Sequence, residues 1–192
     1  MHAEYRLGVD DLTRDLFLAQ DGDLEAFTRV VRSSESDIRR FCTWLTGPPS
    51  DVDDLVQETL LRAFRGLDSF RGDSPGMSWI LTIARRVCLD NSRVKARQQR
   101  NSILMRNDRL QSATTSGQSS FHALADLVKQ LPEPLRESFV LVRVLEFSYA
   151  EVARIQSVPT GTVQSRVSRA RALLAAMYDV AIDTTVSQVA SS

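Results

Sequence analysis

Apolar residues recur every three or four positions along most of the chain, and this spacing predicts amphipathic helices. In the first half, apolar stripes cover residues 24–45 and 55–67, the second including Phe64, and a third begins at Met77. Gly47-Pro48-Pro49 ends the first stripe because proline cannot continue the helical hydrogen-bond ladder. No window alternates steadily at every second position, as a half-buried strand would. The pattern therefore predicts an all-α fold.

The second half is also helical, and proline and small polar residues mark its turns. Residues 131–134 (LPEP) predict a turn that opens a helix, since proline fits the first helical turn. Residues 148–151 (SYAE) form a capping box, in which serine and glutamate satisfy each other's backbone amides. Residues 159–161 (PTG) predict a tight turn before a last helix that buries Val163 and Val167. This half therefore ends in two helices joined by a turn, a helix-turn-helix unit.

A polar stretch of low complexity, residues 111–120 (QSATTSGQSS), separates the two halves. It contains no large apolar residue, and the segment before it is highly charged, so a flexible linker is expected between two small helical domains. The expected boundaries are an N-terminal extension over 1–20, a first domain over 21–98, the linker over 99–120, a helix-turn-helix domain over 121–180 and a loose polar tail over 181–192.

The net charge is zero, with 24 basic and 24 acidic residues, but the charges are segregated along the chain. Residues 51–58 hold four acids and no base, whereas residues 85–100 hold six bases and one acid. No acid lies between Glu151 and Asp179, and four arginines do. Basic stripes on a neutral protein indicate two separate contacts with a polyanion. Solvated helix faces are the alternative that the charges alone leave open.

The composition argues against several kinds of site. Two cysteines and two histidines are too few for a disulfide framework or a histidine-rich metal centre, so no metal or cofactor is expected. No glycine-rich phosphate loop is present. No stretch reaches the roughly 18 apolar residues of a membrane span, and the charged N-terminus does not resemble a signal peptide, so a cytoplasmic protein is expected. Cys42 and Cys88 lie near apolar stripes and are expected to be buried small residues.

The last predicted helix carries polar and basic residues on the face opposite its apolar stripe. An α-helix fits the major groove of DNA, where glutamine, serine and arginine bond base edges and phosphates. This pattern is typical of a DNA-binding helix-turn-helix. A plain three-helix bundle with a basic surface is the alternative at this point.

Three segments carry a more specific pattern: DVDDLVQETLLRAFRGLDSFRGDS (51–74), SWILTIARRVCLDNSR (78–93) and LPEPLRESFVLVRVLEFSYAEVARIQSVPTGTVQSRVSRARALL (131–174). Together, and in this order, they resemble the extracytoplasmic-function (ECF) sigma factors of the sigma-70 family, over roughly residues 20–178. The resemblance implies a bacterial transcription initiation factor, not an enzyme. Such a factor binds core RNA polymerase, directs it to a promoter and helps to open the DNA. The first half then resembles the sigma-2 domain and the second half the sigma-4 domain.

The resemblance implies that one face of the helix over residues 51–67 binds core polymerase. In the family the equivalent face grips the clamp helices of the polymerase beta-prime subunit, and the beta flap is a further expected contact. On this chain the face consists of Asp53, Asp54, Gln57, Glu58, Leu61 and Arg62. Acids would meet a basic helix there, and Leu61 would supply apolar area. An acidic face exposed only to solvent is the alternative.

The resemblance also implies that the loop after this helix reads the promoter's −10 element and holds a base flipped out of the DNA stack. The positions assigned to −10 DNA are Phe70, Asp73, Ser74, Met77, Trp79, Arg85, Arg86 and Arg93, with Lys95 and Arg97 as further backbone contacts. Phe70 and Trp79 are equally compatible with a place in the core. Gly76 and Met77 replace residues that are often aromatic or bulky in the family, and Arg86 replaces a frequent asparagine. These departures leave fewer stacking surfaces for a single strand.

The outward face of the last helix matches the family's contacts to the −35 element. Its residues are Gln164, Ser165, Ser168 and Arg169, with Arg166 and Arg171 nearer to phosphates. Gln164 departs from a commoner arginine or lysine, which shifts the expected base preference from guanine towards adenine.

Two other kinds of protein compete with the sigma factor interpretation. A stand-alone helix-turn-helix regulator would bind DNA without polymerase, but it gives the acidic helix and the loop after it no role. A nucleic-acid-processing enzyme would need clustered carboxylates or a metal site with substrate access, and the only dense acidic cluster, 51–58, lies on a predicted helix with no partnering histidine. Many members of the family are held inactive by an anti-sigma factor. Such a factor is a further candidate partner, although no residue here identifies it.

Overall fold

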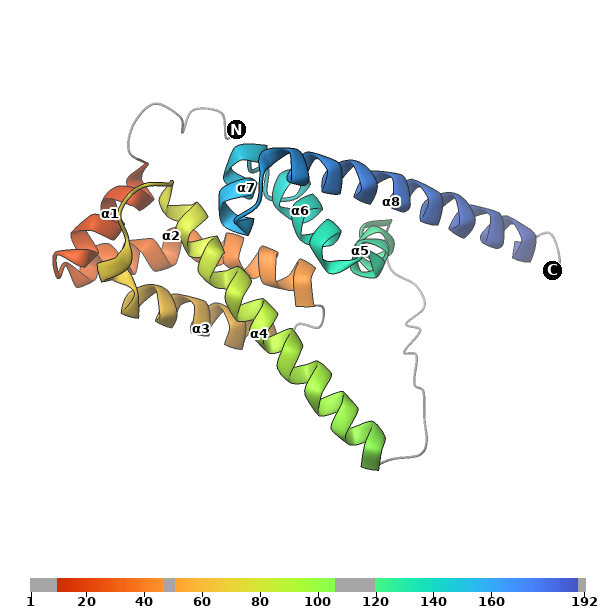
Figure 1. Cartoon of the computed structure of the whole chain (residues 1–192), viewed down its shortest axis with the longest axis horizontal. Helices are drawn as coiled ribbons and strands as arrows, with labels where there is room; N and C mark the ends of the chain where they lie inside the picture. Colours follow the sequence, from red (N-terminus) through yellow and green to blue (C-terminus); the bar gives the residue numbers. More distant parts are fainter. Residues whose placement is uncertain (1–9, 47–50, 106–119, 190–192) are drawn as a thin grey trace.

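The computed structural model describes residues 10–46, 51–105 and 120–189, and all of its regular structure is helical. The first half contains α1 (Asp11–Gln20), α2 (Leu24–Thr46), α3 (Val52–Arg65), the short 3-10 helix η2 (Leu67–Ser69) and α4 (Gly76–Met105). The second half contains α5 (Ser120–Gln130), α6 (Glu133–Arg143), α7 (Tyr149–Gln156) and α8 (Thr160–Val189). No strand occurs in these ranges, which confirms the predicted all-α fold (Figure 1).

The helices of the first half pack around one apolar centre. Leu16 of α1, Ile38 and Phe41 of α2 and Ile80 of α4 are fully buried, and α3 adds Val56. These residues come from the periodic stripes, because one apolar side of each helix must find another to leave water. The two cysteines lie here as expected: both are buried, and their sulfur atoms are 3.5 Å apart.

The segment over residues 11–20 was expected to belong to an N-terminal extension outside the first domain, and the structure differs from this expectation. Residues 1–9 lie outside the described residues, but residues 11–20 form α1, which packs on α2. Asp10 caps this helix by accepting a hydrogen bond from the Thr13 amide, and Leu16 inserts fully into the core. Helix α1 therefore belongs to the first helical unit.

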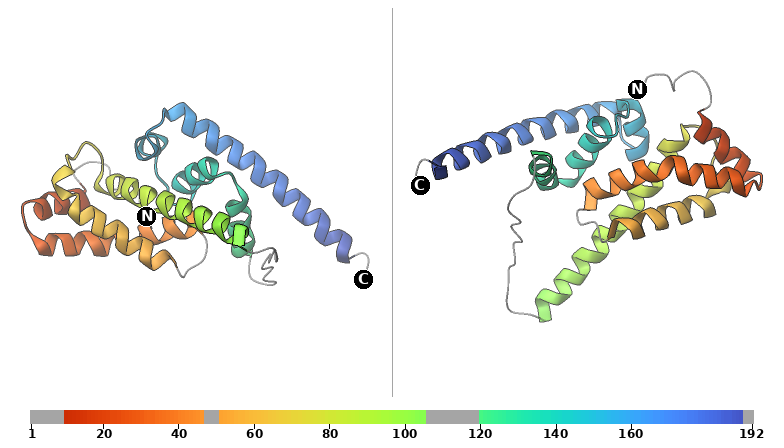
Figure 2. Two further views of the ribbon diagram at one scale, coloured as in Figure 1. Left: turned by 60° about the horizontal axis from the view of Figure 1, so that its bottom comes forward. Right: turned by 180° about the vertical axis from the view of Figure 1, so that it is seen from behind.

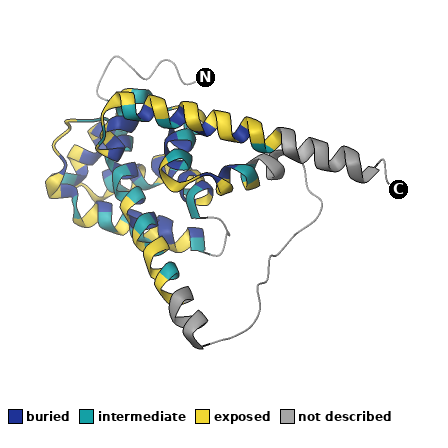
Figure 3. Cartoon of the chain, turned by 45° about the vertical axis from the view of Figure 1, so that its right-hand side comes forward, coloured by how far each residue is buried: buried dark blue, intermediate teal, exposed yellow. Residues whose placement is uncertain are grey.

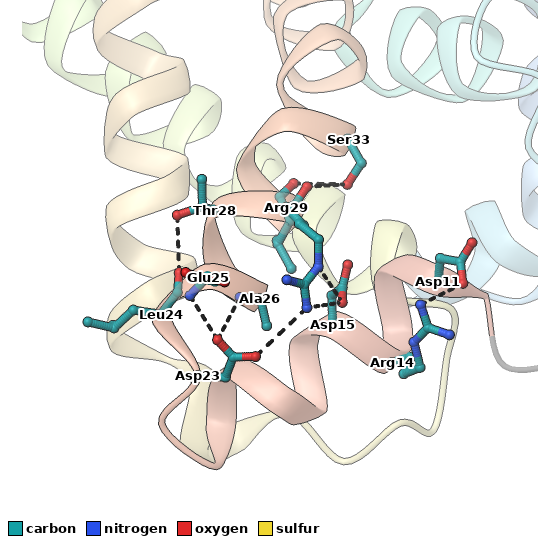
Figure 4. A network of polar contacts seen from close by, with 11 residues as sticks. Asp11, Arg14, Asp15, Asp23, Leu24, Glu25, Ala26, Thr28, Arg29 and Ser33 are labelled. Atoms are coloured by element: carbon teal, nitrogen blue, oxygen red, sulfur yellow. Dashed lines mark hydrogen bonds and ion pairs between the residues drawn. The ribbon is translucent and has the colours of Figure 1, made fainter.

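A network of polar contacts fastens α1 to α2 (Figure 4). Arg29 of α2 donates two hydrogen bonds to Asp15 of α1, at 3.0 and 2.9 Å, and also lies 3.8 Å from Asp23. The side chain of Asp15 is only 9% exposed, so this pair is shielded from solvent on the Asp15 side. Both bonds go to one oxygen, Asp15 Oδ1, and charge-assisted bonds of this kind are stronger than those between neutral groups.

Two helices are longer than the sequence predicts. Helix α4 continues to Met105, so the start of the expected linker over residues 99–120 is helical, and residues 106–119 lie outside the described residues. Helix α8 continues to Val189, so the expected loose tail over residues 181–192 is helical for most of its length. Neither segment contains a glycine or proline that would stop a helix at the expected boundary.

The second half is built around the helix-turn-helix, α7 and α8. Val140 and Leu141 of α6, Val152 of α7 and Val163 of α8 are completely buried together with neighbouring apolar residues. The turn between α7 and α8 begins at Ser157, which adopts a left-handed conformation with φ of 55°. Thus a short, tight connection sets the angle at which α8 leaves the domain.

The predicted capping box at the start of α7 is confirmed. Glu151 donates its backbone amide to Ser148 Oγ at 3.3 Å, and the Ser148 amide donates to Glu151 Oε2 at 2.8 Å. Replacing Ser148 with alanine should lower the free energy of unfolding by about 1 kcal/mol, because one amide of the first turn loses its acceptor. Urea denaturation measures this loss. Ser148→Thr is the control, since it keeps the hydroxyl, and equal midpoints for all three proteins would rule out a capping contribution.

The two halves contact each other directly, with α7 against α4 and with α5 and α6 against α2 (Figures 1 and 2). Arg85 of α4 forms an ion pair with Glu137 of α6. Arg40 of α2 donates to the backbone carbonyl of Val144 at 2.7 Å. The first half is therefore held to the helix-turn-helix half by charged contacts as well as apolar ones.

Candidate polymerase and nucleic-acid interfaces

The six residues assigned to polymerase binding lie on the solvent side of α3, opposite the buried Leu55 and Val56. Asp53, Asp54, Gln57 and Leu61 are exposed, whereas Glu58 and Arg62 are half-exposed. The helix repeat puts them on one face because residues three or four apart are neighbours. This surface, together with the exposed apolar residues beside it, is called the α3 face below.

Ion pairs fix part of the charge on the α3 face. Arg39 of α2 pairs with Asp53. Arg62 bridges Glu58 of its own helix at 2.7 Å and Asp90 of α4 at 3.1 Å. The neighbouring carboxylates raise the pKa of Arg62, chiefly through the hydrogen bond to Glu58. The face therefore presents ordered charges around Leu61 rather than a set of loose side chains.

The α3 face is more apolar than the sequence predicts. Phe64 was expected in the buried stripe, but it is 43% exposed, close to the 42% of Leu61. Its ring meets that of Phe27 on α2 edge-on, with centroids 4.9 Å apart. Leu24 lies one helical turn before Phe27 and is 68% exposed. The pattern missed this surface because the pairing of two aromatic residues across helices leaves no periodic signal.

The residues assigned to −10 recognition divide between the core and the surface of the segment over residues 70–76. This segment ends at Gly76, the first residue of α4, and is called the η2–α4 loop below. Phe70 is 3% exposed and packs between Phe17 and Trp79, with ring centroids 5.0 and 5.2 Å away. Phe70 therefore lies in the core, one of its two expected places, and Trp79 is half-buried beside it. Asp73 is exposed and Ser74 is half-exposed, so both polar side chains are accessible on the loop, as is the neighbouring Arg71.

The basic residues of α4 point in different directions. Arg86, Arg93 and Arg97 are exposed, and Met77 is half-buried at the start of the helix. Lys95 pairs with Asp51 at the start of α3. Arg85 faces the second half of the chain and pairs with Glu137, so it does not share the exposed surface of Arg86. The sequence pattern did not separate Arg85 from Arg86, because it does not show that Glu137 of the second half packs against Arg85.

Glu137 is the more deeply buried member of its ion pair with Arg85, with a side chain 4% exposed against 27% for Arg85. Burial raises the pKa of Glu137, and the positive charge of Arg85 offsets part of that rise. The ionised carboxylate thus depends on Arg85, because a buried charge without a partner is strongly disfavoured.

Most of the α8 residues assigned to −35 DNA are exposed, and exposed positions recur along the part of this helix that Figure 3 colours by burial. Exposed positions on this helix include Gln164, Ser165, Ser168, Arg169 and Arg171. Arg166 is half-buried and donates to Gln156 Oε1 of α7 at 3.0 Å, so it braces the two helices against each other. The stripe opposite, including Val163 and Val167, is buried as predicted.

An apolar groove runs between α5, α6 and α8, lined by Leu127, Phe139, Leu174 and Tyr178 among others. Arg143 and Arg171 also line it, so the groove combines apolar area with positive charge. Within the described ranges, no three His, Cys, Asp or Glu side chains are grouped so that they could hold a metal ion. No helix in those ranges is long and apolar enough to span a bilayer.

Comparisons with known proteins match both halves of the chain. The Sigma-70 region 2 profile matches residues 30–98, and the Sigma-70 region 4 profile matches residues 121–174. The ECF RNA polymerase sigma factor SigC of Mycobacterium tuberculosis is 33% identical over 160 residues, which is 82% of this chain and 86% of that protein. The ECF RNA polymerase sigma factor EcfG of Rhodopseudomonas palustris is 36% identical over 153 residues, 78% of this chain and 83% of that protein.

The fold is similar to that of a solved sigma factor. The sigma factor RpoE of Bartonella quintana, in its complex with the anti-sigma factor NepR, superposes with a TM-score of 0.68 at 28% identity. The match covers 80% of this chain and 97% of that one. With sigma-70 regions 2 and 4 both present in order, and with relatives above 30% identity aligned over most of their length, the chain belongs to the ECF sigma factors and is an RNA polymerase sigma factor.

Proposed function

We propose that this sigma factor joins core RNA polymerase to a promoter through three separate surfaces: the α3 face, the η2–α4 loop and the outward face of α8. The observation that carries this proposal is that the α3 face and the α8 face are both exposed and belong to different halves of the chain. One molecule can therefore hold polymerase and DNA at the same time. A stand-alone regulator would leave the α3 face without a use.

On the polymerase side, the α3 face suits the clamp helices of the beta-prime subunit. The exposed side chains of Leu24, Leu61 and Phe64 supply apolar area, and acids such as Asp54 and Glu58 supply charge opposite to that of a basic helix. The groove between α5, α6 and α8 suits the beta flap, because apolar side chains of a flap segment would find both apolar area and the positive charges of Arg143 and Arg171 there.

On the DNA side, the face of α8 would lie in the major groove at the −35 element. Gln164 and Arg169, both exposed, would bond base edges, and Arg171 would bond phosphate. At the −10 element, Asp73 and Ser74 would hold the flipped base, while Arg86 and Arg93 contact the backbone. In this assignment Phe70 and Trp79 support the loop from beneath instead of stacking on bases.

The chain acts in this proposal as an initiation factor in the cytoplasm, and the bond-forming chemistry belongs to the polymerase. An anti-sigma factor is a further proposed partner, since the Bartonella quintana relative was solved with one. A factor that covered the α3 face would block polymerase binding without altering the fold.

Replacing Leu61 with aspartate should weaken binding to core polymerase at least tenfold, because a charge would enter the apolar centre of the α3 face. The measurement is a titration of the labelled full chain with core polymerase, followed by fluorescence anisotropy. Leu18→Asp is the matched control, since Leu18 is 39% exposed, close to the 42% of Leu61, and lies on α1. Equal losses in the two variants would remove the α3 face from the interface.

A further inference from the structure

Helix α1 contacts the η2–α4 loop at its beginning, its middle and its end. Gln20 Nε2 donates to the backbone carbonyls of Leu67 and Phe70, at 2.9 and 3.2 Å, where the chain enters the loop. At the other end, the Gly76 amide donates to Thr13 Oγ1 at 2.7 Å. Both contacts join parts of the chain that lie roughly fifty or more residues apart in sequence.

The middle of the loop rests on Phe17. Gly72 has a φ of +71°, and a Cβ atom added there would lie 2.6 Å from Phe17 Cζ. A Cβ atom on Gly76 would lie 2.8 Å from Leu16 Cδ1 and 3.2 Å from the Thr13 backbone. Both glycines therefore let the loop approach α1 more closely than any other residue could.

The contacting side chains share one face of α1. Thr13, Phe17 and Gln20 are spaced by four and three residues, which places them in a row along the helix. Leu16, beside this row, anchors the helix in the core, and the Arg29–Asp15 contact fastens it to α2 (Figure 4). Because α1 is held firmly by the core and by α2, its contacts fix the position of the η2–α4 loop.

We propose that α1 is a positioning element for −10 recognition, in which Thr13, Phe17 and Gln20 hold the η2–α4 loop in the shape that receives the promoter strand. The inference rests on the proposed function of that loop. It concerns a helix that precedes residues 30–98, the part matched by region 2. A loop already held in its binding shape loses little conformational freedom when it captures DNA, so fixing it raises affinity and selectivity.

The test uses holoenzyme assembled from core polymerase and the full chain, carrying Thr13→Val or Gln20→Leu. Thr13→Val keeps the shape of the side chain but removes the acceptor for the Gly76 amide, whereas Thr13→Ser keeps the hydroxyl and is the matched control. The probe is a pool of promoter fragments with a randomised −35 hexamer and a randomised, premelted −10 bubble. Bound fragments are sequenced, and enrichment is measured separately at the two elements.

We expect the enrichment at the −10 bubble to fall at least fivefold in both variants. Enrichment at −35 and affinity for core polymerase should stay within twofold of wild type. Thr13→Ser should behave as wild type. Undiminished −10 enrichment in the variants would overturn the inference, and so would a parallel loss at both elements and in core binding, which marks a general folding defect. If circular dichroism shows that Thr13→Val does not fold, the result for Gln20→Leu decides the test. Gln20 is half-buried at the edge of the core, so its replacement disturbs the packing less than that of the buried Thr13.

The same experiment separates this inference from the proposed function. If the wild-type holoenzyme enriches sequences at −35 but none at the −10 bubble, the η2–α4 loop does not read DNA, and both the loop's proposed role and the role of α1 are rejected. If the wild type enriches −10 sequences and the variants do so equally, only the role of α1 is rejected.

Discussion

Replacing Arg85 with alanine is expected to destabilise the folded chain by about 2–3 kcal/mol, because it leaves the carboxylate of Glu137 buried without its cation. Removing one partner of a fully buried pair costs about 3–5 kcal/mol, and the partial exposure of Arg85 places this pair somewhat lower. The loss falls on the contact between α4 and α6, and therefore on the packing of the two halves. Urea denaturation of the full chain, with circular dichroism as the signal, measures it.

The size of this loss should depend on pH in a definite direction. Burial already raises the pKa of Glu137 above its ordinary value of 4.5, and losing Arg85 raises it further. In the variant the folded state then binds a proton at a higher pH than the unfolded state does. The stability deficit should therefore shrink as pH falls below neutrality, because the folded variant takes up this proton more readily than the unfolded chain does.

A double variant supplies the control for this explanation. Arg85→Ala combined with Glu137→Gln replaces the stranded carboxylate with a neutral amide, which costs less to bury. The double variant should recover most of the lost stability, and its difference from wild type should no longer shrink at low pH. A deficit that is independent of pH and unrelieved by Glu137→Gln would mean that Arg85 stabilises the chain through packing of its aliphatic portion alone.

Replacing Arg169 with alanine is expected to lower the affinity of the holoenzyme for its promoter by about 1–3 kcal/mol, the value of a bidentate contact to a base. This corresponds to a loss of roughly 5- to 150-fold in binding. Arg169 is exposed on α8 and lies one helical turn from Ser165, so its guanidinium is free to enter the major groove. A footprinting titration at fixed salt measures the change.

Arg154→Ala is the matched control, because Arg154 is also exposed but lies on α7, the first helix of the helix-turn-helix. A contact to phosphate lowers binding to all sequences alike, whereas a contact to a base matters only at the correct −35 element. Arg169→Ala should therefore lose its effect on a promoter whose −35 element has been scrambled. An equal loss on both promoters would reassign Arg169 to phosphate contact.

The parts of this fold that depend on local chemistry were predictable from the sequence. The apolar stripe of α8, with Val163 and Val167, also fixes which residues face outward, so the exposed face of α8 followed from the same spacing. The capping box needed only the serine and the glutamate three residues later. Asp10, followed by apolar residues at helical spacing, is the signal that would have identified α1.

The contacts between distant segments were not predictable in this way. Arg85 was assigned to DNA because its neighbours are basic, yet its partner Glu137 lies 52 residues further along the chain. Phe64 fits the apolar stripe of α3 by spacing, but it packs edge-on against Phe27 and stays 43% exposed. Periodicity reports which side of a helix is apolar, and only the packing of helices decides whether that side is covered.

Run-off transcription with core polymerase on a library of promoter fragments, with and without this chain, tests the central claim most directly. A sigma factor that joins polymerase to DNA through the α3 and α8 faces should yield specific transcripts only when it is added, and their start sites should share sequences near −10 and −35. Leu61→Asp should abolish these transcripts, whereas Leu18→Asp should preserve them. A chain that does not bind core polymerase, and protects DNA equally well without it, would contradict the account.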